Sequence, residues 1–168
     1  MPHVSVTALA LSLLLSAAFA TGATALDTKP SISLELAKRM ADACEAKAKQ
    51  EGWKLSIAVV DPGADLVLFR RMPNAHLGSV DIAQGKARTA ARMPFPTRRL
   101  AEIVYGEDGK GGRVPGLAHI EGFTAFTGGL PIKAGDTLVG GIGISGATGD
   151  QDEECADAAL AAIADDLK

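Results

Sequence analysis

Apolar and polar residues alternate with a helical period near both ends of the polar part of the chain. Between Ser33 and Gln50, apolar positions return every three or four residues with charged side chains between them, and Gly52 follows. This spacing places the apolar side chains on one face, so it predicts an amphipathic helix that ends at the glycine. A last helix is expected after Asp150, because Asp150 and Glu153 have the spacing of a capping box and an alanine-rich stretch follows.

Residues 54–70 have the pattern of a β-hairpin. Residues 54–60 and 65–70 are rich in valine, isoleucine and leucine, and Asp61-Pro62-Gly63 lies between them. These three residues favour a turn, so the two apolar runs are predicted to be neighbouring antiparallel strands.

Two helices are expected next, over residues 79–92 and 97–105. Small apolar residues recur at helical spacing in the first, and Ser79 is a suitable residue to cap it. Pro94 and Pro96 separate the two helices, since proline cannot continue a helix.

The glycine-rich residues 106–113 predict a loop, and short strands are expected near 124–126 and 132–133. Residues 137–145 form an apolar run whose glycines leave room for close approach by another backbone or a ligand. Because strands joined by short turns cannot be parallel neighbours, the order of elements predicts an α+β fold with a mainly antiparallel sheet covered by helices. Residues 26–168 contain no internal repeat and no interdomain linker, so a single domain is expected.

The first 25 residues have the pattern of a signal peptide. They carry no Lys, Arg, Asp or Glu, and they contain an apolar run from Val4 to Ala20. Two small-x-small sequences offer cleavage sites, Ala18-Phe19-Ala20 and Ala23-Thr24-Ala25, and the second is favoured because the polar chain begins just beyond it. An uncleaved anchor is the alternative, but the run is short for a span, which typically needs about 20 residues. We therefore expect cleavage before Leu26, a periplasmic or secreted protein, and no stable membrane insertion after cleavage.

The charge and composition exclude some partners. The net charge is −3 and aromatic residues make up only 4% of the chain, so neither a basic surface nor a base-stacking platform for nucleic acid is expected. Two cysteines, Cys44 and Cys155, fall in the first and last predicted helices. In an oxidising compartment they can form one bridge, and otherwise they are two buried thiols.

Four motifs together are similar to the GlcG/HbpS family. They are IAVVDPG at 57–63, IAQGKARTA at 82–90, GGLPI at 128–132 and GGIGISGATGDQDE at 140–153. The resemblance covers essentially the whole of residues 26–168. It implies a central antiparallel sheet with profilin-like layering, self-association into dimers or larger rings, and binding of heme. In some members it also implies slow heme breakdown with release of iron, and the related C-terminal domain of PduO-type proteins binds heme as well.

Two positions depart from the family's pattern. A Glu-x-x-Glu motif that binds iron in an exported member reads Asp81 and Gln84 here, so one carboxylate remains. Many members have a histidine shortly after the first hairpin glycine, where this chain has Asp65. A ligand at that place is therefore not transferred to this chain.

The resemblance places the heme pocket near residues 112–129, and this gives the candidate site. His119 is the candidate axial ligand of the heme iron, because imidazole nitrogen commonly fills that role, and the alternative is a histidine of a surface loop. Phe123 and Phe126 would pack on the porphyrin. Cations on the helix over 79–92 would lie near the propionates, and they are Lys86, Arg88 and Arg92. The alternative pairs Lys86 and Arg88 with Asp81 or neighbouring helix carboxylates.

His76 is the other imidazole in residues 26–168, and an exposed turn histidine of this kind needs no role. The chain has no Ser-His-Asp order, no His-Glu-x-x-His motif and no phosphate loop, so no catalytic residue is assigned. The leading hypothesis is an exported heme-binding protein that acts as a scavenger, carrier or sensor component. The alternatives are an enzyme or accessory protein that acts on a small carboxylate, and a non-catalytic structural oligomer.

The signal-peptide interpretation predicts that the mature protein begins near Leu26 and lies outside the cytoplasm. Intact-mass measurement of the exported protein tests this, and a soluble cytosolic product that retains residues 1–25 would contradict it.

Overall fold

A computed structural model describes residues 27–168, so the expected signal peptide lies outside the described residues. The centre of the fold is a sheet of β1 (Ser56–Val60), β2 (Leu66–Arg71), β3 (Gly129–Ala134) and β4 (Thr137–Ser145). The strand order is β2-β1-β4-β3, and every neighbouring pair is antiparallel. The predicted antiparallel sheet is therefore confirmed.

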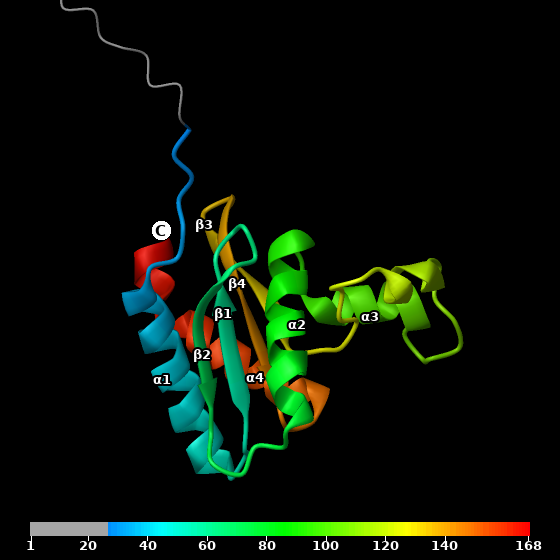
Figure 1. The fold of residues 1–168 in the computed structure, drawn as a ribbon, viewed down its shortest axis with the longest axis horizontal. Coiled ribbons are helices and arrows are strands. Elements are labelled where there is room, and N and C mark those ends of the chain that lie inside the picture. Colours follow the sequence, from blue (N-terminus) through cyan, green and yellow to red (C-terminus); the bar gives the residue numbers. More distant parts are fainter. Residues whose placement is uncertain (1–26) are drawn as a thin grey trace, which may run out of the picture.

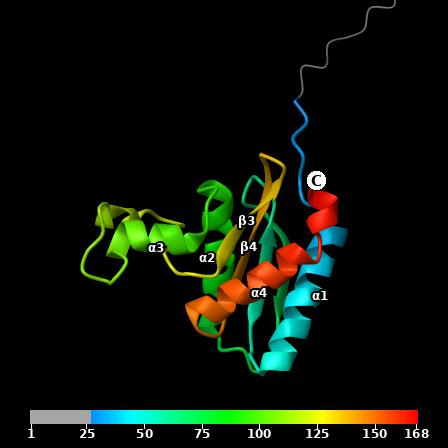
Figure 2. The same ribbon diagram turned by 180° about the vertical axis from the view of Figure 1, so that it is seen from behind.

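Helices cover both faces of this sheet (Figures 1 and 2). Helices α1 (Leu34–Glu51) and α4 (Gly149–Ala161) lie together on one face, and α2 (Gly78–Arg92) lies on the other. Helix α3 (Thr97–Tyr105) and the 3-10 helix η1 (Pro115–His119) extend away from the sheet beside α2 as a projecting arm. A short 3-10 turn, η2 (Ala164–Leu167), ends the chain. Within residues 27–168, no helix has the length and apolar character needed to cross a bilayer.

The alternating side chains of β1 divide the core into two layers. Ile57 and Val59 pack with α1 and α4 in the larger cluster, whereas Ala58 and Val60 pack against the alanines of α2. Only small side chains separate α2 from the sheet. A Cβ atom added at Gly143 would lie 2.1 Å from the carbonyl oxygen of Ala83. The glycines of β4 thus allow the backbones of α2 and β4 to touch, as the sequence indicated.

The strand predicted at 124–126 is wrong, because these residues form a loop whose polar groups are bonded by threonine side chains. The hydroxyl of Thr89 on α2 accepts the N–H of Thr124 at 2.8 Å. The hydroxyl of Thr97 donates to the carbonyl oxygen of Phe126 at 2.6 Å and accepts the N–H of Gly129 at 2.9 Å. A single strand, β3, therefore begins only at Gly129.

Two helix starts also differ from the prediction. Helix α4 is capped by Thr148, whose side chain accepts the N–H of Gln151 while the Gln151 side chain accepts the N–H of Thr148. This is a capping box with the usual hydroxyl, two residues before the predicted Asp150. Ser79 does not cap α2, which begins at Gly78; its buried hydroxyl donates to the carbonyl oxygen of His76.

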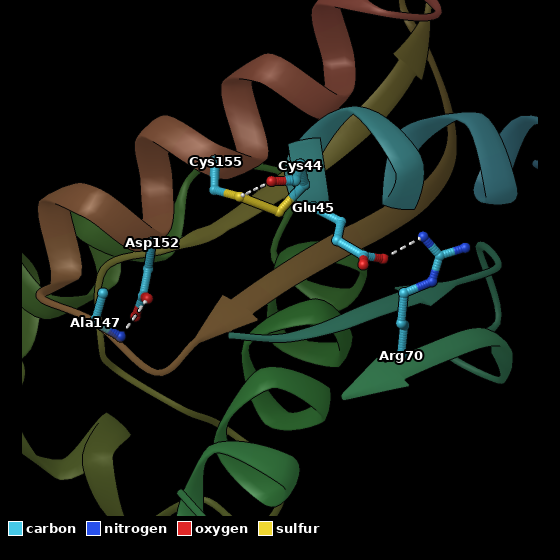
Figure 3. The surroundings of a disulfide bond; sticks show 6 residues. All are labelled: Cys44, Glu45, Arg70, Ala147, Asp152 and Cys155. Carbon is cyan, nitrogen blue, oxygen red and sulfur yellow. Dashed lines mark hydrogen bonds and ion pairs between the residues drawn. A yellow bond between two sulfur atoms is a disulfide. The ribbon is translucent and has the colours of Figure 1, made fainter. Parts of the chain in front are cut away.

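A disulfide joins Cys44 on α1 to Cys155 on α4 in the larger core (Figure 3). Both residues are fully buried, and the bridge closes a loop with a sequence separation of 111 residues. Of the two alternatives left open by the sequence, the structure has the bridged one. It also fits the oxidising compartment expected for an exported protein.

Reduction of this bridge should lower the free energy of unfolding by about 2–5 kcal/mol, because the unfolded chain regains the freedom of a long loop. Denaturant unfolding of the oxidised protein and of the Cys44→Ala/Cys155→Ala variant measures the difference. Two free thiols titrated in the unfolded, unreduced protein would contradict the bridge itself.

Candidate functional site

A hollow lies between α2, α3 and the loop of residues 125–127. It consists of two adjoining chambers of about 460 and 300 Å³, within the usual size range of small-molecule sites. The residues that line only the larger one, which we call the Lys86 chamber, include Lys86 itself, His76, Thr127, Ser145 and Asp152. The residues that line only the smaller one, which we call the Phe123 chamber, include Phe123 itself, Asp81 and Ala118. The residues that line both chambers are Ile82, Tyr105, Ala125 and Phe126.

The shared wall of the hollow is apolar and partly open to water. Phe126 is 55% exposed and Tyr105 is 43% exposed, although both are large aromatic side chains. Exposed aromatic side chains beside a concave apolar surface mark a place where a ligand can remove them from water. The geometry therefore favours a flat, largely apolar ligand.

An ion pair closes the polar side of the Lys86 chamber. The Lys86 ammonium lies 2.7 Å from a carboxylate oxygen of Asp152 and donates to the carbonyl oxygen of Ile144, also at 2.7 Å. The other oxygen of Asp152 accepts the N–H of Ala147 at 3.1 Å (Figure 3). Each side chain of the pair is only 3% exposed. The pair therefore ties α2 to the end of β4 and to the first turn of α4.

Burial shifts the pKa of both members of this pair. Loss of water lowers the pKa of the Lys86 ammonium from its usual value, and the charge of Asp152 opposes that shift. Burial likewise raises the pKa of the Asp152 carboxyl, opposed by Lys86. Removal of one partner would leave the other as an uncompensated buried charge.

Gly128 lets the chain pass directly over the ion pair. Its φ of +114° lies in a region that side-chain-bearing residues rarely adopt. A Cβ atom there would lie 2.6 Å from Cβ of Asp152 and 2.9 Å from Nζ of Lys86. The first glycine of the GGLPI motif is therefore required by this contact.

His76 is the imidazole that the structure places on the wall of the hollow. Its Nδ1 accepts the N–H of Ser79 at 3.1 Å, and the ring lines the Lys86 chamber. In a neutral imidazole with an accepting Nδ1, the proton resides on Nε2. His76 in this arrangement is therefore a hydrogen-bond donor, and it would have to give up the bond to Ser79 to bind a metal through Nε2.

Three of the six residues predicted from the family resemblance line the hollow, namely Lys86, Phe123 and Phe126. The other three do not line either chamber. His119 is exposed at the end of η1, next to Ala118, which lines the Phe123 chamber. Its ligation of heme iron stays a prediction.

The two arginines of α2 also lie outside the walls. Arg88 is half-buried and donates a long hydrogen bond of 3.4 Å to Gln84, and Arg92 is exposed beside Gly122. The alternative that paired Lys86 with Asp81 or another nearby helix carboxylate is wrong. Its partner is Asp152, 66 residues away.

No feature of the sequence indicates that Asp152 and Ser145 belong to the site. Both fall inside the GGIGISGATGDQDE motif, but nothing in their spacing pairs them with α2. Across residues 27–168, no group of three histidine, cysteine or acidic side chains is placed to hold a metal ion.

Comparison with known proteins gives a consistent match. A model of the family described as haem degrading protein HbpS-like matches residues 32–161. An uncharacterised 15.0 kDa protein from the dhaT-dhaS intergenic region of Citrobacter freundii is 35% identical over 131 residues, which are 77% of this chain and 89% of that protein.

Two solved structures are similar to this chain in both fold and sequence. A double mutant of Streptomyces reticuli HbpS has a TM-score of 0.76 and 30% identity, and the match covers 95% of this chain and 97% of that one. A PduOC:heme complex has a TM-score of 0.72 and 32% identity, and the match covers 79% of this chain and 95% of that one.

The buried ion pair predicts a large effect of single substitutions. Lys86→Met should lower the free energy of unfolding by about 3–5 kcal/mol, because it leaves the Asp152 carboxylate buried without its partner. The double variant Lys86→Met/Asp152→Asn should be more stable than the two single changes predict by addition. Denaturant unfolding measures both.

Lys49→Met is the matched control, because Lys49 forms an ion pair with Glu45 but its side chain is 66% exposed. It should leave stability nearly unchanged. Equal losses for Lys86→Met and Lys49→Met would contradict the structural role of the buried pair.

Proposed function

Because the chain belongs to the HbpS-like family of haem-degrading proteins, we propose that it is an exported heme-binding protein that acts as a scavenger, carrier or sensor component. The similar PduOC domain, solved in complex with heme, supports this proposal. The observation that carries it in this chain is the hollow, with two adjoining chambers beside the exposed Tyr105 and Phe126.

The residues present fit a heme group. A porphyrin is flat and apolar with two carboxylates at one edge, and the hollow joins an apolar shared wall to a chamber lined by hydrogen-bond donors. Phe123 and Phe126 would hold the ring, and Arg88 and Arg92 on the exposed side of α2 are available to carboxylates at its rim. When bound, heme supplies the iron chemistry with oxygen or peroxide.

His119 would reach the iron from the projecting arm. Its neighbour Ala118 already lines the Phe123 chamber, so a ring that extends beyond this chamber would approach η1. His76 is the competing imidazole, at the other end of the hollow, but its bond to Ser79 opposes ligation. Separate substitution of the two histidines distinguishes them.

Two finer proposals accompany heme binding. The first is slow breakdown of the bound heme with release of iron, in keeping with the description of the family. The second is self-association, favoured by the edge strands β2 and β3 and by exposed apolar residues on the arm such as Val114 and Ile120.

Titration of the protein with heme should give a shifted Soret band. Phe126→Ala should weaken binding by about tenfold or more, equivalent to about 1.4 kcal/mol, because it removes the exposed aromatic wall. His119→Ala should remove the shift or weaken binding to a similar degree, and His76→Ala should change it little.

Leu34→Ala is the matched control for Phe126→Ala, since Leu34 is similarly exposed at the start of α1, outside the hollow. The absence of any Soret shift in the wild-type protein would refute heme binding. Unchanged binding in His119→Ala would refute only the role of that histidine.

A further inference from the structure

The Lys86 chamber is lined by a hydroxyl that no other group in the described fold uses. Ser145, the last residue of β4, is 4% exposed and lines the chamber. In residues 27–168 its hydroxyl has no hydrogen-bond partner, whereas the adjacent buried Ser56 donates to the hydroxyl of Ser79, which itself donates to His76. Oε2 of Glu153 is the one fully buried, unpaired side-chain atom in residues 27–168, so the Ser145 hydroxyl stays accessible from the chamber, where a ligand can accept its proton.

Other unused donors converge on the same chamber. His76 lines the chamber, and its Nε2 carries the proton because its Nδ1 accepts the N–H of Ser79. The hydroxyl of Thr127 is half-buried and has no partner in the described chain. Gly149, the first residue of α4, also lines the chamber, and the N–H groups of a first helical turn have no acceptor within the helix.

No unpaired carboxylate in the described chain lines the chamber, so none would repel a bound anion. Asp152 is the one carboxylate that lines it in the described chain, and both of its oxygens are occupied, by Lys86 and by the N–H of Ala147. Lys86 balances the charge of Asp152, and Arg98 pairs with Asp150 and Glu153 at the start of α4, so an incoming anion meets donors and the positive end of the α4 dipole.

From this arrangement we propose that the Lys86 chamber is a carboxylate-binding subsite. Ser145, Thr127, His76 and the first turn of α4 donate to the two oxygens, and the Lys86–Asp152 pair positions β4 and α4 around them. A carboxylate has two oxygens and a single charge, and Lys86, the one lysine or arginine that lines this chamber in the described chain, is already paired with Asp152. Neither Arg88 nor Arg92 lines this chamber.

The remaining lining describes the rest of the ligand. Ile82, Ala101 and Ala125 add apolar side chains to the lining of the chamber. The ligand is therefore an acid with an apolar body, either a small aliphatic carboxylic acid or the propionate arm of a bound porphyrin. The subsite is defined by its own donors, so it goes beyond heme binding and does not require it.

Calorimetric titration of the heme-free protein with propionate tests the subsite. Propionate should bind saturably, and propanamide, which has the same shape without the charge, should bind at least about fivefold more weakly, roughly 1 kcal/mol. Ser145→Ala should weaken propionate binding by a similar factor. Thr127→Val is a second, less buried variant with the same expected direction.

Ser56→Ala is the matched control. Ser56 is buried and directly opposite Ser145 in the β1–β4 register, but it does not line the chamber. It should leave propionate binding unchanged, and thermal unfolding of each variant confirms that it is folded.

Heme and its dimethyl ester distinguish the two sources of the carboxylate. Weaker binding of the ester, together with competition between heme and propionate, assigns the subsite to a porphyrin propionate. Propionate binding that heme does not displace assigns it to a separate small acid. Equal effects of Ser145→Ala and Ser56→Ala, or no saturable propionate binding by the heme-free protein, would overturn the proposal. Because propionate is titrated without heme, this result is independent of whether the protein binds heme.

Discussion

Helix α2 packs backbone against backbone on β4, because Gly141 and Gly143 present no side chain to it. A Cβ atom at either glycine would lie within 2.5 Å of a carbonyl oxygen of α2. Because α2 lies so close to β4, the Lys86 side chain is long enough to reach the carbonyl oxygen of Ile144 and the carboxylate of Asp152. A side chain at either glycine would push α2 away from β4 and separate the ion pair. The polar side of the hollow therefore depends on the absence of a Cβ atom at these two positions.

The two faces of the sheet differ in how their side chains pack. The face with α1 and α4 contains the larger apolar cluster and the disulfide. The face with α2 has mostly alanines, which bury less apolar area, and it is extended by the arm with its separate small cluster of Leu100, Val104 and Ala125. The larger apolar cluster and the disulfide therefore lie on one face of the sheet, and the hollow lies on the side of α2.

Periodic segments were predictable from the sequence, and contacts between distant segments were not. The helix at 97–105 agrees with α3 at both ends, and the helix at 33–50 differs from α1 by one residue at each end. The strand at 124–126 failed because Thr89 and Thr97 satisfy its backbone from other elements, and this has no local signature. The family resemblance directed attention to Phe123 and Phe126, which line the hollow. The pairing of Lys86 with Asp152 depends on the three-dimensional approach of α2 to β4, so no spacing revealed it.

The strand order has a consequence for the order of folding. β1 lies in the middle of the sheet and all five of its residues are buried, but its second neighbour, β4, begins only at Thr137. Until β4 is available, one edge of an apolar central strand has no partner, and such edges readily pair with other chains. Cys155 lies 111 residues after Cys44, so the disulfide can form only when nearly the whole chain is available. We therefore expect that the N-terminal half is not a stable folding unit and that a chain truncated before β4 is prone to aggregate.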